Sequence, residues 1–320
     1  MNIMKITQAR VVLTAAAVAG ALMLVGCGGK PVGSTDDDTG AAAASAVEIP
    51  TGDLAADVLK TLDVDDDLAA RVPADIRKNG LAVATADGYP PMEMFDGDGE
   101  TMIGVDMSFA RALATLWGVE LKIENSDQNA MVPGVASGRY DMVISGLNDT
   151  EVRREKVSFV DYATSAGAFV VAKGNPKGIK TPEDMCGKTL AVLDNGYYMQ
   201  LAQTYSEECV AAGADKIEIL GFANDPEALL QLQNGRADAG MNDFPVAQYR
   251  VSLSGDKLEA VEIPGDALFG IGIAPEATDL ISLTQDTMNQ LMQDGSYRDI
   301  LDAWDLGGMG IDEATVNKGN

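Results

Sequence analysis

The sequence predicts an α/β fold in which strands alternate with helices. Apolar runs of strand length recur from residue 81 onward, and helical patterns of apolar residues follow them. Loops rich in Gly, Pro, Asn and Asp separate these segments. Alternation of this kind favours mostly parallel sheets covered by helices. With 46% hydrophobic residues among 320, the chain can bury the core of one large domain or two smaller ones.

The first elements are predicted between residues 81 and 147. Residues 81–86 (LAVATA) form an apolar run that ends at a Gly/Pro loop, which predicts a strand. The acidic stretch 96–100 (DGDGE) is too short for a calcium loop and favours a hairpin turn. A helix is predicted next, because apolar residues recur at helical spacing until a glycine: Phe109, Leu113, Leu116 and Gly118. A strand, a short helix and a buried strand at 142–145 complete this half.

The second half repeats the theme. Strands are expected at 169–174 and within 187–196 and 237–249, and a long helical pattern over 278–306 is interrupted near Gly295. In parallel sheets, ligands bind beyond the carboxyl ends of the strands. The loops to inspect are therefore those that follow apolar runs: ADGYPPM (86–92), SGLNDT (145–150), LDNGYY (193–198) and MNDF (241–244).

Composition excludes several functions. The chain has 49 acidic and 23 basic residues and a net charge of −26, so it repels phosphate backbones and we expect no nucleic-acid partner. It contains no histidine, which excludes Ser-His-Asp and Cys-His catalysis and His-ligated zinc. No cofactor is indicated. An enzyme would have to use carboxylates, Lys or Tyr. Glu93, directly after the loop 86–92, is the carboxylate that could serve as its acid.

The N-terminus predicts an exported lipoprotein. Residues 1–26 combine two basic residues with an apolar core that is too short for a comfortable membrane span. The sequence LVGC ending at Cys27 resembles a bacterial lipobox, in which the cysteine carries a diacylglycerol. An uncleaved anchor or a plain secretory signal is the alternative. Residues 27–46 have the composition of a flexible tether.

Two further cysteines, Cys186 and Cys209, enclose a strand–turn–helix pattern. Export places them in an oxidising compartment, where thiols usually pair. A local disulfide is expected, and two free buried thiols are the alternative.

Two adjacent arginines, Arg153 and Arg154, follow a good helix start at Asn148–Thr150. A guanidinium can hold a carboxylate in bidentate fashion, so the pair could bind an anion. Spacing alone favours a simpler interpretation, in which both pair with nearby acidic residues on a solvated helix face. Because adjacent helical positions differ by about 100°, at most one should face a site.

Asp243 and Tyr89 are further candidates. Asp243 ends an apolar strand and could receive an ammonium group, although spacing alone favours a helix cap. Tyr89, in a loop fixed by two prolines, could form the wall of a ligand site or be an ordinary half-buried tyrosine.

Taken together, the loops resemble the polar amino-acid-binding family of bacterial extracellular solute-binding proteins, which feed ATP-binding-cassette importers. The matching stretches span about residues 75–310 in the order of the family: YPPMEMFDGDGETMIGVDMSFARALA, VASGRYDMVISGLNDTEVRREKVSFVDY, GKTLAVLDNGYY, NGRADAGMNDFPVAQY and LMQDGSYRDILDAW. The cysteine pair and the lipobox resemble lipoprotein members.

The resemblance implies a type II periplasmic-binding-protein-like fold, with two α/β lobes joined by a two-strand hinge around a ligand cleft. Lobe 1 would comprise 75–171 plus 270–312 and lobe 2 would comprise 172–269, with the hinge in FVVAKG (169–174) and LFGIGIAP (268–275). An N-terminal extension (47–74) and a tail (313–320) would flank the lobes.

The resemblance also implies a set of site residues. Arg153 would hold the ligand α-carboxylate and Asp243 the α-ammonium, while Arg154 stays outside. The loop residues Ser145, Gly146 and Asn148 would surround these groups, and Tyr89 and Gln128 would line the side-chain pocket. The loop after the strand predicted within 187–196 would also contribute a backbone N–H. Its residues are Gly196, Tyr197 and Tyr198.

Several positions depart from the family pattern. Asn148 replaces Ser or Thr, and Tyr197 and Tyr198 replace small Thr-type residues. The two tyrosines would move hydroxyls outward and either narrow the pocket or add an aromatic wall to it. Met92 stands where Phe is frequent, and Ser108 where a second Asp is common. The identity of the ligand side chain stays open. A polar or medium-sized side chain is suggested by the pocket residues Asn148, Gln128, Tyr89, Tyr197 and Tyr198.

The resemblance therefore implies a monomeric, lipid-anchored binding protein on the outer face of the cell membrane. It would capture an amino acid and deliver it to permease and ATPase subunits, without being an enzyme. Related two-lobed proteins include dehydratases and lytic enzymes, so an enzyme is the first alternative, and a sensory module or adhesin is the second.

Overall fold

The computed structural model describes residues 47–194 and 196–319, within a compact unit that spans Ala43–Asn320. The predicted signal peptide (1–26), the lipidation site Cys27 and the tether (27–46) lie outside the described residues. In the described part, no helix is both long and apolar enough to cross a membrane.

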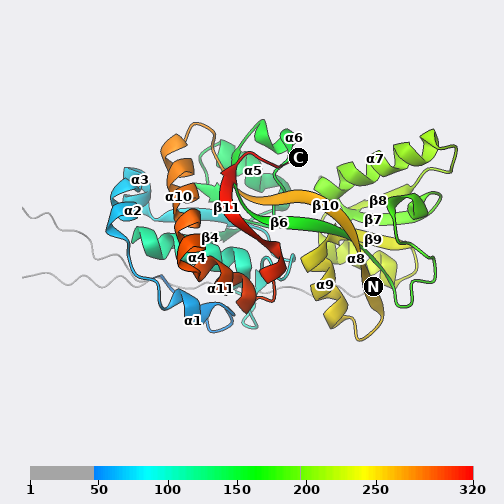
Figure 1. The fold of residues 1–320 in the computed structure, drawn as a ribbon, viewed down its shortest axis with the longest axis horizontal. Coiled ribbons are helices and arrows are strands. Elements are labelled where there is room, and N and C mark those ends of the chain that lie inside the picture. Colours follow the sequence, from blue (N-terminus) through cyan, green and yellow to red (C-terminus); the bar gives the residue numbers. More distant parts are fainter. Residues whose placement is uncertain (1–46, 195, 320) are drawn as a thin grey trace, which may run out of the picture. The chain divides into compact units, whose positions relative to one another are not determined.

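One large sheet organises the structure, with strand order β4-β1-β5-β10-β6-β9-β7-β8 and β11 paired to β6. Figure 1 shows β6, β10 and β11 at its centre. Its two long central strands are β6 (Ser158–Ala172) and β10 (Leu258–Ile273), which pair antiparallel over most of their length. The sheet divides around them into two α/β lobes.

The first lobe contains three parallel strands: β1 (Leu81–Thr85), β4 (Leu121–Asn125) and β5 (Met142–Val143). Its long helices are α4 (Val105–Trp117), α5 (Gln128–Ala136), α10 (Thr278–Asp294) and α11 (Ser296–Ala303). The hairpin predicted at DGDGE connects β2 (Met94–Phe95) to β3 (Met102–Ile103). Short elements complete the lobe: α1 (Ala56–Leu59), α2 (Asp66–Arg71), α3 (Ala74–Asn79), α6 (Glu151–Arg154) and the 3₁₀ helix η2 (Gly307–Met309).

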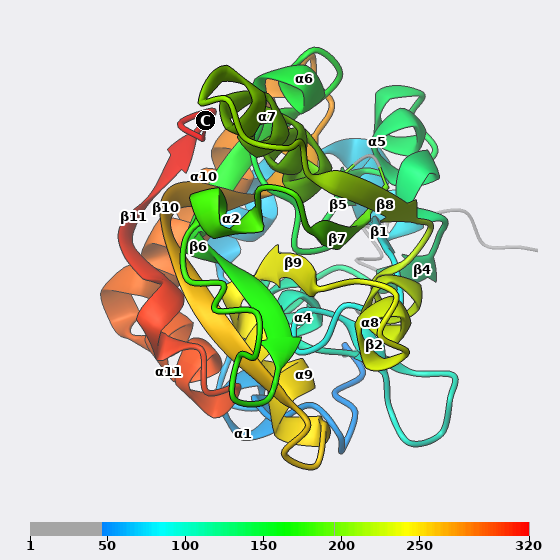
Figure 2. The ribbon, with the colours of Figure 1, turned by 90° about the vertical axis from the view of Figure 1, so that its right-hand side faces the viewer.

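The second lobe contains β7 (Thr189–Leu193), β8 (Glu218–Phe222) and β9 (Ala239–Asp243). Figure 2 shows these strands with α7 (Tyr197–Ala211), α8 (Asp225–Gln233) and α9 (Phe244–Leu253) around them. Strand β7 pairs in parallel with both β8 and β9, and the 3₁₀ helix η1 (Pro182–Met185) precedes it.

The two central strands change partners near their midpoints. Strand β6 pairs with β11 at Val160–Ala163 and with β9 at Gly167–Val171. The register between β6 and β10 is irregular between Ile263 and Ala267. The chain therefore passes between lobes at about 163–167 and 263–267, beside the segments expected to hold the hinge.

The expectation of mostly parallel sheets is wrong at the centre. Parallel pairs occur within each lobe, but β6 and β10 pair antiparallel with each other and with β5, β9 and β11. The reason is that both strands run through the two lobes, and they do so in opposite directions.

The N-terminal segment 47–74 packs on the first lobe. Its Asp53 is buried and forms a 3.1 Å ion pair with Arg111 of α4. Leu59 and Leu68, from α1 and α2, join the main apolar core.

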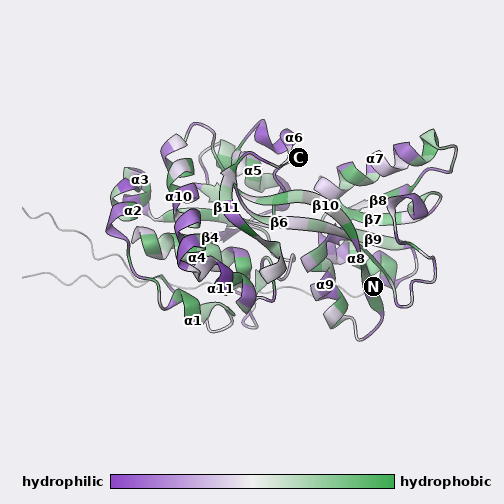
Figure 3. Ribbon diagram, in the orientation of Figure 1, coloured by the Kyte–Doolittle hydropathy of each residue, from purple (hydrophilic) through white to green (hydrophobic). Residues whose placement is uncertain are grey.

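At the other end, the segment expected as a tail includes part of β11 (Gly310–Val316). The backbone N–H of Gly319 then donates to Asp149 at 2.7 Å. The charged and exposed residues of β11 hide its strand character from a sequence pattern. In Figure 3, hydrophobic residues follow the central strands, whereas the outer helices α10 and α11 carry hydrophilic residues.

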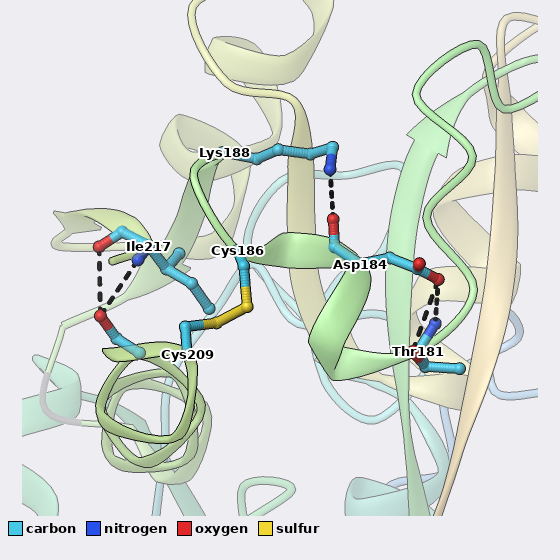
Figure 4. The surroundings of a disulfide bond; sticks show 7 residues. Thr181, Asp184, Cys186, Lys188, Cys209 and Ile217 are labelled. Carbon is cyan, nitrogen blue, oxygen red and sulfur yellow. Dashed lines mark hydrogen bonds between the residues drawn. A yellow bond between two sulfur atoms is a disulfide. The ribbon is translucent and has the colours of Figure 1, made fainter. Parts of the chain in front are cut away.

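The predicted disulfide is confirmed. Cys186 and Cys209 are bonded, with their Cα atoms 5.5 Å apart, and they link the end of η1 to α7 (Figure 4). The cysteines flank β7, so the bond fastens a helix of the second lobe to the start of the strand that leads into the candidate site.

Candidate functional site

A cavity lies at the loops that follow β1, β5, β7 and β9, where the sequence predicted a site. Nine of the ten predicted ligand-site residues line it: Tyr89, Gln128, Ser145, Gly146, Asn148, Arg153, Gly196, Tyr197 and Tyr198. The space open to the centres of water-sized molecules is about 40 Å³, so the site is narrow. Residues of both lobes contribute to its walls.

Arg153 lies on the first-lobe side of the cavity. Thr150 caps α6 by accepting a hydrogen bond from the backbone N–H of Arg153 at 3.4 Å, and Nη1 of Arg153 donates to the carbonyl of Asn148 at 2.8 Å. Burial lowers the pKa of Arg153, and the nearby charge of Asp243 opposes this effect. Arg153 forms no ion pair with any residue that the structure describes, so its charge remains available to an anion.

Arg154 has a different role. Its Nη1 forms a 3.0 Å ion pair with Asp149, whose side chain is buried, and donates to the carbonyl of Gly319 at 2.9 Å. It does not line the cavity. The structure therefore separates the two arginines, as the helical geometry predicted.

Asp243 lies behind the cavity wall on the second-lobe side and is 1% exposed. Although it is the N-cap residue of α9, its side chain makes no capping hydrogen bond. Its carboxylate instead accepts from the hydroxyls of Tyr89, Ser165 and Tyr198, and from Nδ2 of Asn148 at 3.4 Å. Burial raises the pKa of Asp243, and these hydrogen bonds oppose the rise.

Tyr198 departs from the sequence expectation. Its hydroxyl lies inside the site and donates to Asp243 at 2.8 Å, rather than moving outward. Tyr197 lines the cavity beside it, and the two rings make an edge-to-face contact with centroids 5.1 Å apart. The two tyrosines therefore form an aromatic wall.

The loop after β5 rests on two buried carboxyl groups. The hydroxyl of Ser145 donates to Oε1 of Glu93 at 2.7 Å, and the backbone N–H of Gly146 donates to Oδ2 of Asp106 at 2.6 Å. Gly146 has a φ of +50°, and a Cβ there would lie 3.0 Å from the Tyr89 ring. Glycine is therefore needed where this loop turns beneath Tyr89.

Contacts across the cleft join the lobes. Besides the bond from Tyr89 to Asp243, Nη2 of Arg250 on α9 donates to the carbonyl of Gly88 at 2.6 Å. Arg250 also pairs with Asp225 at 3.0 Å, and Asp225 accepts from the side chain of Asn242. Sequence reasoning missed this network, because nothing in the local pattern marks a residue that meets another lobe.

Asp106 was also missed. It lies in the first turn of α4 and is fully buried, where it accepts a hydrogen bond from the hydroxyl of Tyr162. An acidic residue in a first helical turn is common on surfaces, so the local pattern carries no signal that Asp106 is buried. Within the described ranges, no cluster of three or more His, Cys, Asp or Glu could hold a metal ion.

Comparisons with known proteins agree with this geometry. A sequence model of the bacterial extracellular solute-binding proteins, family 3, matches residues 81–307. The arginine-binding protein ArgT of Corynebacterium glutamicum is 32% identical over 262 residues, which cover 79% of this chain and 83% of that protein. The L-cystine-binding protein TcyJ of Escherichia coli is 27% identical over 236 residues, which cover 72% and 84%.

Solved structures show the same arrangement. An ancestral arginine-binding protein bound to arginine has a TM-score of 0.64 and 30% identity, covering 70% of this chain and 97% of that one. An ancestral amino acid-binding protein, described as a precursor of cyclohexadienyl dehydratase, has a TM-score of 0.64 and 29% identity, covering 72% and 97%. These matches confirm the expected two-lobed type II fold.

Proposed function

Because the chain belongs to family 3 of the bacterial extracellular solute-binding proteins, we propose that it captures an amino acid in its interlobe cavity and delivers it to an ATP-binding-cassette importer. The observation that carries the proposal is the cavity itself. Loops from both lobes converge on it, with a cationic Arg153 on one side and an anionic Asp243 on the other.

Arg153 would bind the α-carboxylate of the ligand. Its guanidinium is held in place by the Asn148 carbonyl and has no ion-pair partner among the described residues. The planar fork of an arginine can donate two parallel hydrogen bonds to a carboxylate. Ser145, Gly146 and Asn148 lie on the loop beside it, and the start of α7 at Gly196 faces the same space.

Asp243 would neutralise the α-ammonium from the opposite lobe. In the structure, the hydroxyls of Tyr89 and Tyr198 stand between its carboxylate and the cavity. An ammonium group can donate three hydrogen bonds, so it can replace the Tyr89 hydroxyl as donor while Tyr198 keeps its place. Gln128 and Tyr197 would then contact the ligand side chain.

Binding would favour the closed cleft. A ligand held by Arg153 and Asp243 makes both contacts only when the lobes approach, so it stabilises that state over the open one. The hydrogen bond from Arg250 to the carbonyl of Gly88 closes the same gap. The hinge that we propose is the partner change of β6 and β10 at about 163–167 and 263–267.

The cellular setting is part of the proposal. The lipobox at Cys27 supports attachment by lipid to the outer face of the cell membrane, and the family supports delivery of the ligand to permease and ATPase subunits by a monomer. The named relatives are binding proteins for arginine and cystine, which supports an amino-acid ligand.

An enzyme is the second candidate, because one observation favours it. Glu93 is a buried carboxyl in the cavity, and burial together with Asp106 raises its pKa well above the usual value, as a general acid requires. Recovery of a bound ligand chemically unchanged after long incubation supports the binding function. Its conversion to a product would support the enzyme.

A thermal-shift screen of the purified protein against the twenty amino acids tests the proposed function. A ligand at a hundredfold excess over its Kd stabilises a protein by about 2.7 kcal/mol. For a chain of this size, we expect the Tm to rise by roughly 5–10 °C with at least one amino acid. The proposal fails if none of the twenty raises the Tm.

A further inference from the structure

Residues 317–319 follow β11 and lie beyond residue 307, where the match to the family model ends. Asn317 forms two hydrogen bonds with Phe159 of β6. Its backbone N–H donates to the Phe159 carbonyl at 3.1 Å, and its Oδ1 accepts from the Phe159 N–H at 2.8 Å. Asn317 has a φ of +56°, a left-handed conformation that Asn adopts more readily than most residues. The chain therefore turns at Asn317, and we call residues 317–319 the strap.

The strap donates its backbone N–H groups to two buried carboxylates. The N–H of Lys318 donates to Oδ2 of Asp161 at 3.0 Å, and the N–H of Gly319 donates to Oδ2 of Asp149 at 2.7 Å. Asp161 is 0% exposed and Asp149 is 2% exposed. Figure 1 places this end of the chain beside α6, where Nη1 of Arg154 donates to the Gly319 carbonyl at 2.9 Å. The strap is therefore bonded to the segment that carries the site arginine.

Gly319 packs so closely on Asp149 that a side chain does not fit between them. A Cβ at Gly319 would lie 2.2 Å from the carbonyl oxygen of Asp149 and 2.5 Å from its Cβ. Neither atom is the flexible end of a side chain, so the added methyl group would push the strap off the loop. Glycine is required here by the close approach of two backbones.

One peptide group connects Asp149 to Arg153. Its N–H belongs to Asp149 and donates to the Leu268 carbonyl of β10 at 2.9 Å. Its carbonyl belongs to Asn148 and accepts from Nη1 of Arg153 at 2.8 Å. Because a peptide group is planar, a rotation that displaces the Asp149 N–H also turns the Asn148 carbonyl. The placement of Asp149 therefore sets where the Arg153 guanidinium is held.

Helix α6 has little packing of its own to fix this loop. It has four residues, all half-buried or exposed, and Val152 is 58% exposed. So short a helix has little stability without tertiary contacts. Oδ1 of Asp149 has no hydrogen-bond partner among the described residues, so the donors to Oδ2 hold the carboxylate. Loss of the Gly319 donor would leave a buried carboxylate poorly satisfied and favour a shift of the loop toward water.

Resting on the amino-acid site proposed above, we propose that the strap positions Arg153 for the ligand carboxylate, acting through Asp149 and the peptide group before it. The strap itself does not line the cavity. It fixes the loop, the loop fixes the Asn148 carbonyl, and that carbonyl orients the guanidinium. Attachment of the strap and binding of the ligand therefore stabilise each other, because coupling between two sites is reciprocal.

Titration calorimetry of Gly319→Ala tests the role of the strap. The first probe is L-arginine, the ligand named for ArgT, and if arginine does not bind, the amino acid that raises the Tm most in the screen replaces it. We expect affinity to fall at least about fivefold, as for the loss of a hydrogen bond that orders a charged group, and by less than in Arg153→Ala. Affinity within about twofold of wild type would overturn the inference.

Two variants are controls. Lys318 is exposed and donates to Asp161 through its backbone, so Lys318→Ala keeps this bond and should change affinity less than about twofold. Arg154→Ala removes the partner of the Gly319 carbonyl but leaves the Gly319 N–H on Asp149, so the strap should stay in place and most of the affinity should remain.

A double variant identifies the residue through which the strap acts. In the Arg153→Ala background, Gly319→Ala should change affinity less than about twofold, because the guanidinium that the strap positions is already absent. A strap with a merely structural role would lower stability and leave the affinity of the folded protein unchanged. An affinity loss of the same size in both backgrounds would show that the strap does not act through Arg153.

Amide hydrogen exchange of the wild-type protein provides a second measurement that needs no variant. Saturating ligand should slow exchange of the Gly319 N–H at least about fivefold, by the reciprocity of the coupling. Exchange at Gly319 that is unchanged by the ligand would overturn the inference. Circular dichroism checks that each variant folds, and the exchange measurement decides the matter if Gly319→Ala does not.

The two proposals fail in different ways. If none of the twenty amino acids binds the wild-type protein, the proposed function fails and this inference with it. If an amino acid binds and Gly319→Ala binds it as tightly as wild type, the amino-acid site stands and only the role of the strap is wrong.

Discussion

Arg153 and Arg154 are neighbours in sequence, but their guanidinium groups have different partners. The helical rotation between adjacent residues predicts that only one can face a given site, and the structure places Arg153 at the cavity and Arg154 on Asp149. What spacing could not predict is which of the two faces the cavity. That choice depends on residues that are distant in sequence. Asp149, the partner of Arg154, also contacts Asp161 of β6 and accepts a hydrogen bond from the backbone N–H of Gly319.

A second pair of buried carboxyl groups, Asp149 and Asp161, should make stability depend on pH. Burial, with a contribution from Asp149, raises the pKa of Asp161 to about 7, whereas an unfolded aspartate titrates near ~3.9. A raised folded-state pKa means that this stabilisation is complete below about pH 4 and is lost as the pH rises through about 7.

Asp161→Asn should remove this dependence. An amide oxygen can still accept from Thr315 Oγ1 and the Lys318 N–H, which donate to Asp161 at 2.9 and 3.0 Å. We expect the variant to gain about 1–3 kcal/mol relative to wild type between pH 5 and pH 8, measured by urea unfolding. Asp299→Asn, at an exposed position on α11, is the control. Parallel pH profiles for wild type and Asp161→Asn would contradict the assignment.

Among the elements, the strands with uninterrupted apolar runs were the most predictable. The apolar segments near residues 81, 142 and 189 are all strands, and Gly295 separates α10 from α11 as expected. Strand β6 is longer than predicted, because the sequence before Phe169 mixes polar residues that the crossing strands accommodate. Strand β11 was not predicted, because its acidic residues face solvent and its register against β6 is irregular.

The disulfide between η1 and α7 should stabilise the second lobe. It closes a loop with a sequence separation of 23, and loops of this length correspond to about 3 kcal/mol of stabilisation in the chain-entropy account. We expect reduction to lower the free energy of unfolding by about this amount, measured by denaturant unfolding with and without reductant.

The double variant Cys186→Ser, Cys209→Ser is the matched control. It should be as unstable as the reduced wild type and should not respond to reductant. If reductant leaves the unfolding midpoint of the wild type unchanged, the bond contributes nothing to stability.

For the whole molecule, the sequence predicted the loops that would meet but not how they interlock. The loops that follow β1, β5, β7 and β9 all line the cavity. The order of the motifs along the chain was enough to predict this convergence. The hydrogen bond from Tyr198 to Asp243, the contact of Arg250 with Gly88 and the hydrogen bond from Ser145 to Glu93 were not predictable. Each depends on how side chains from distant segments fill a shared space, and local patterns carry no signal of it.

The central claim is that one amino acid bridges the two lobes, with its carboxylate on Arg153. Calorimetry of Arg153→Ala and Arg154→Ala with an amino acid found in the screen tests it most directly. Truncating one partner of a buried charge pair costs about 2–5 kcal/mol, so Arg153→Ala should lower affinity at least roughly 30-fold. Arg154→Ala leaves the buried Asp149 without its ion pair, so it should lower stability yet change affinity less than threefold. A loss of affinity below threefold for Arg153→Ala would remove Arg153 from the site and contradict the account.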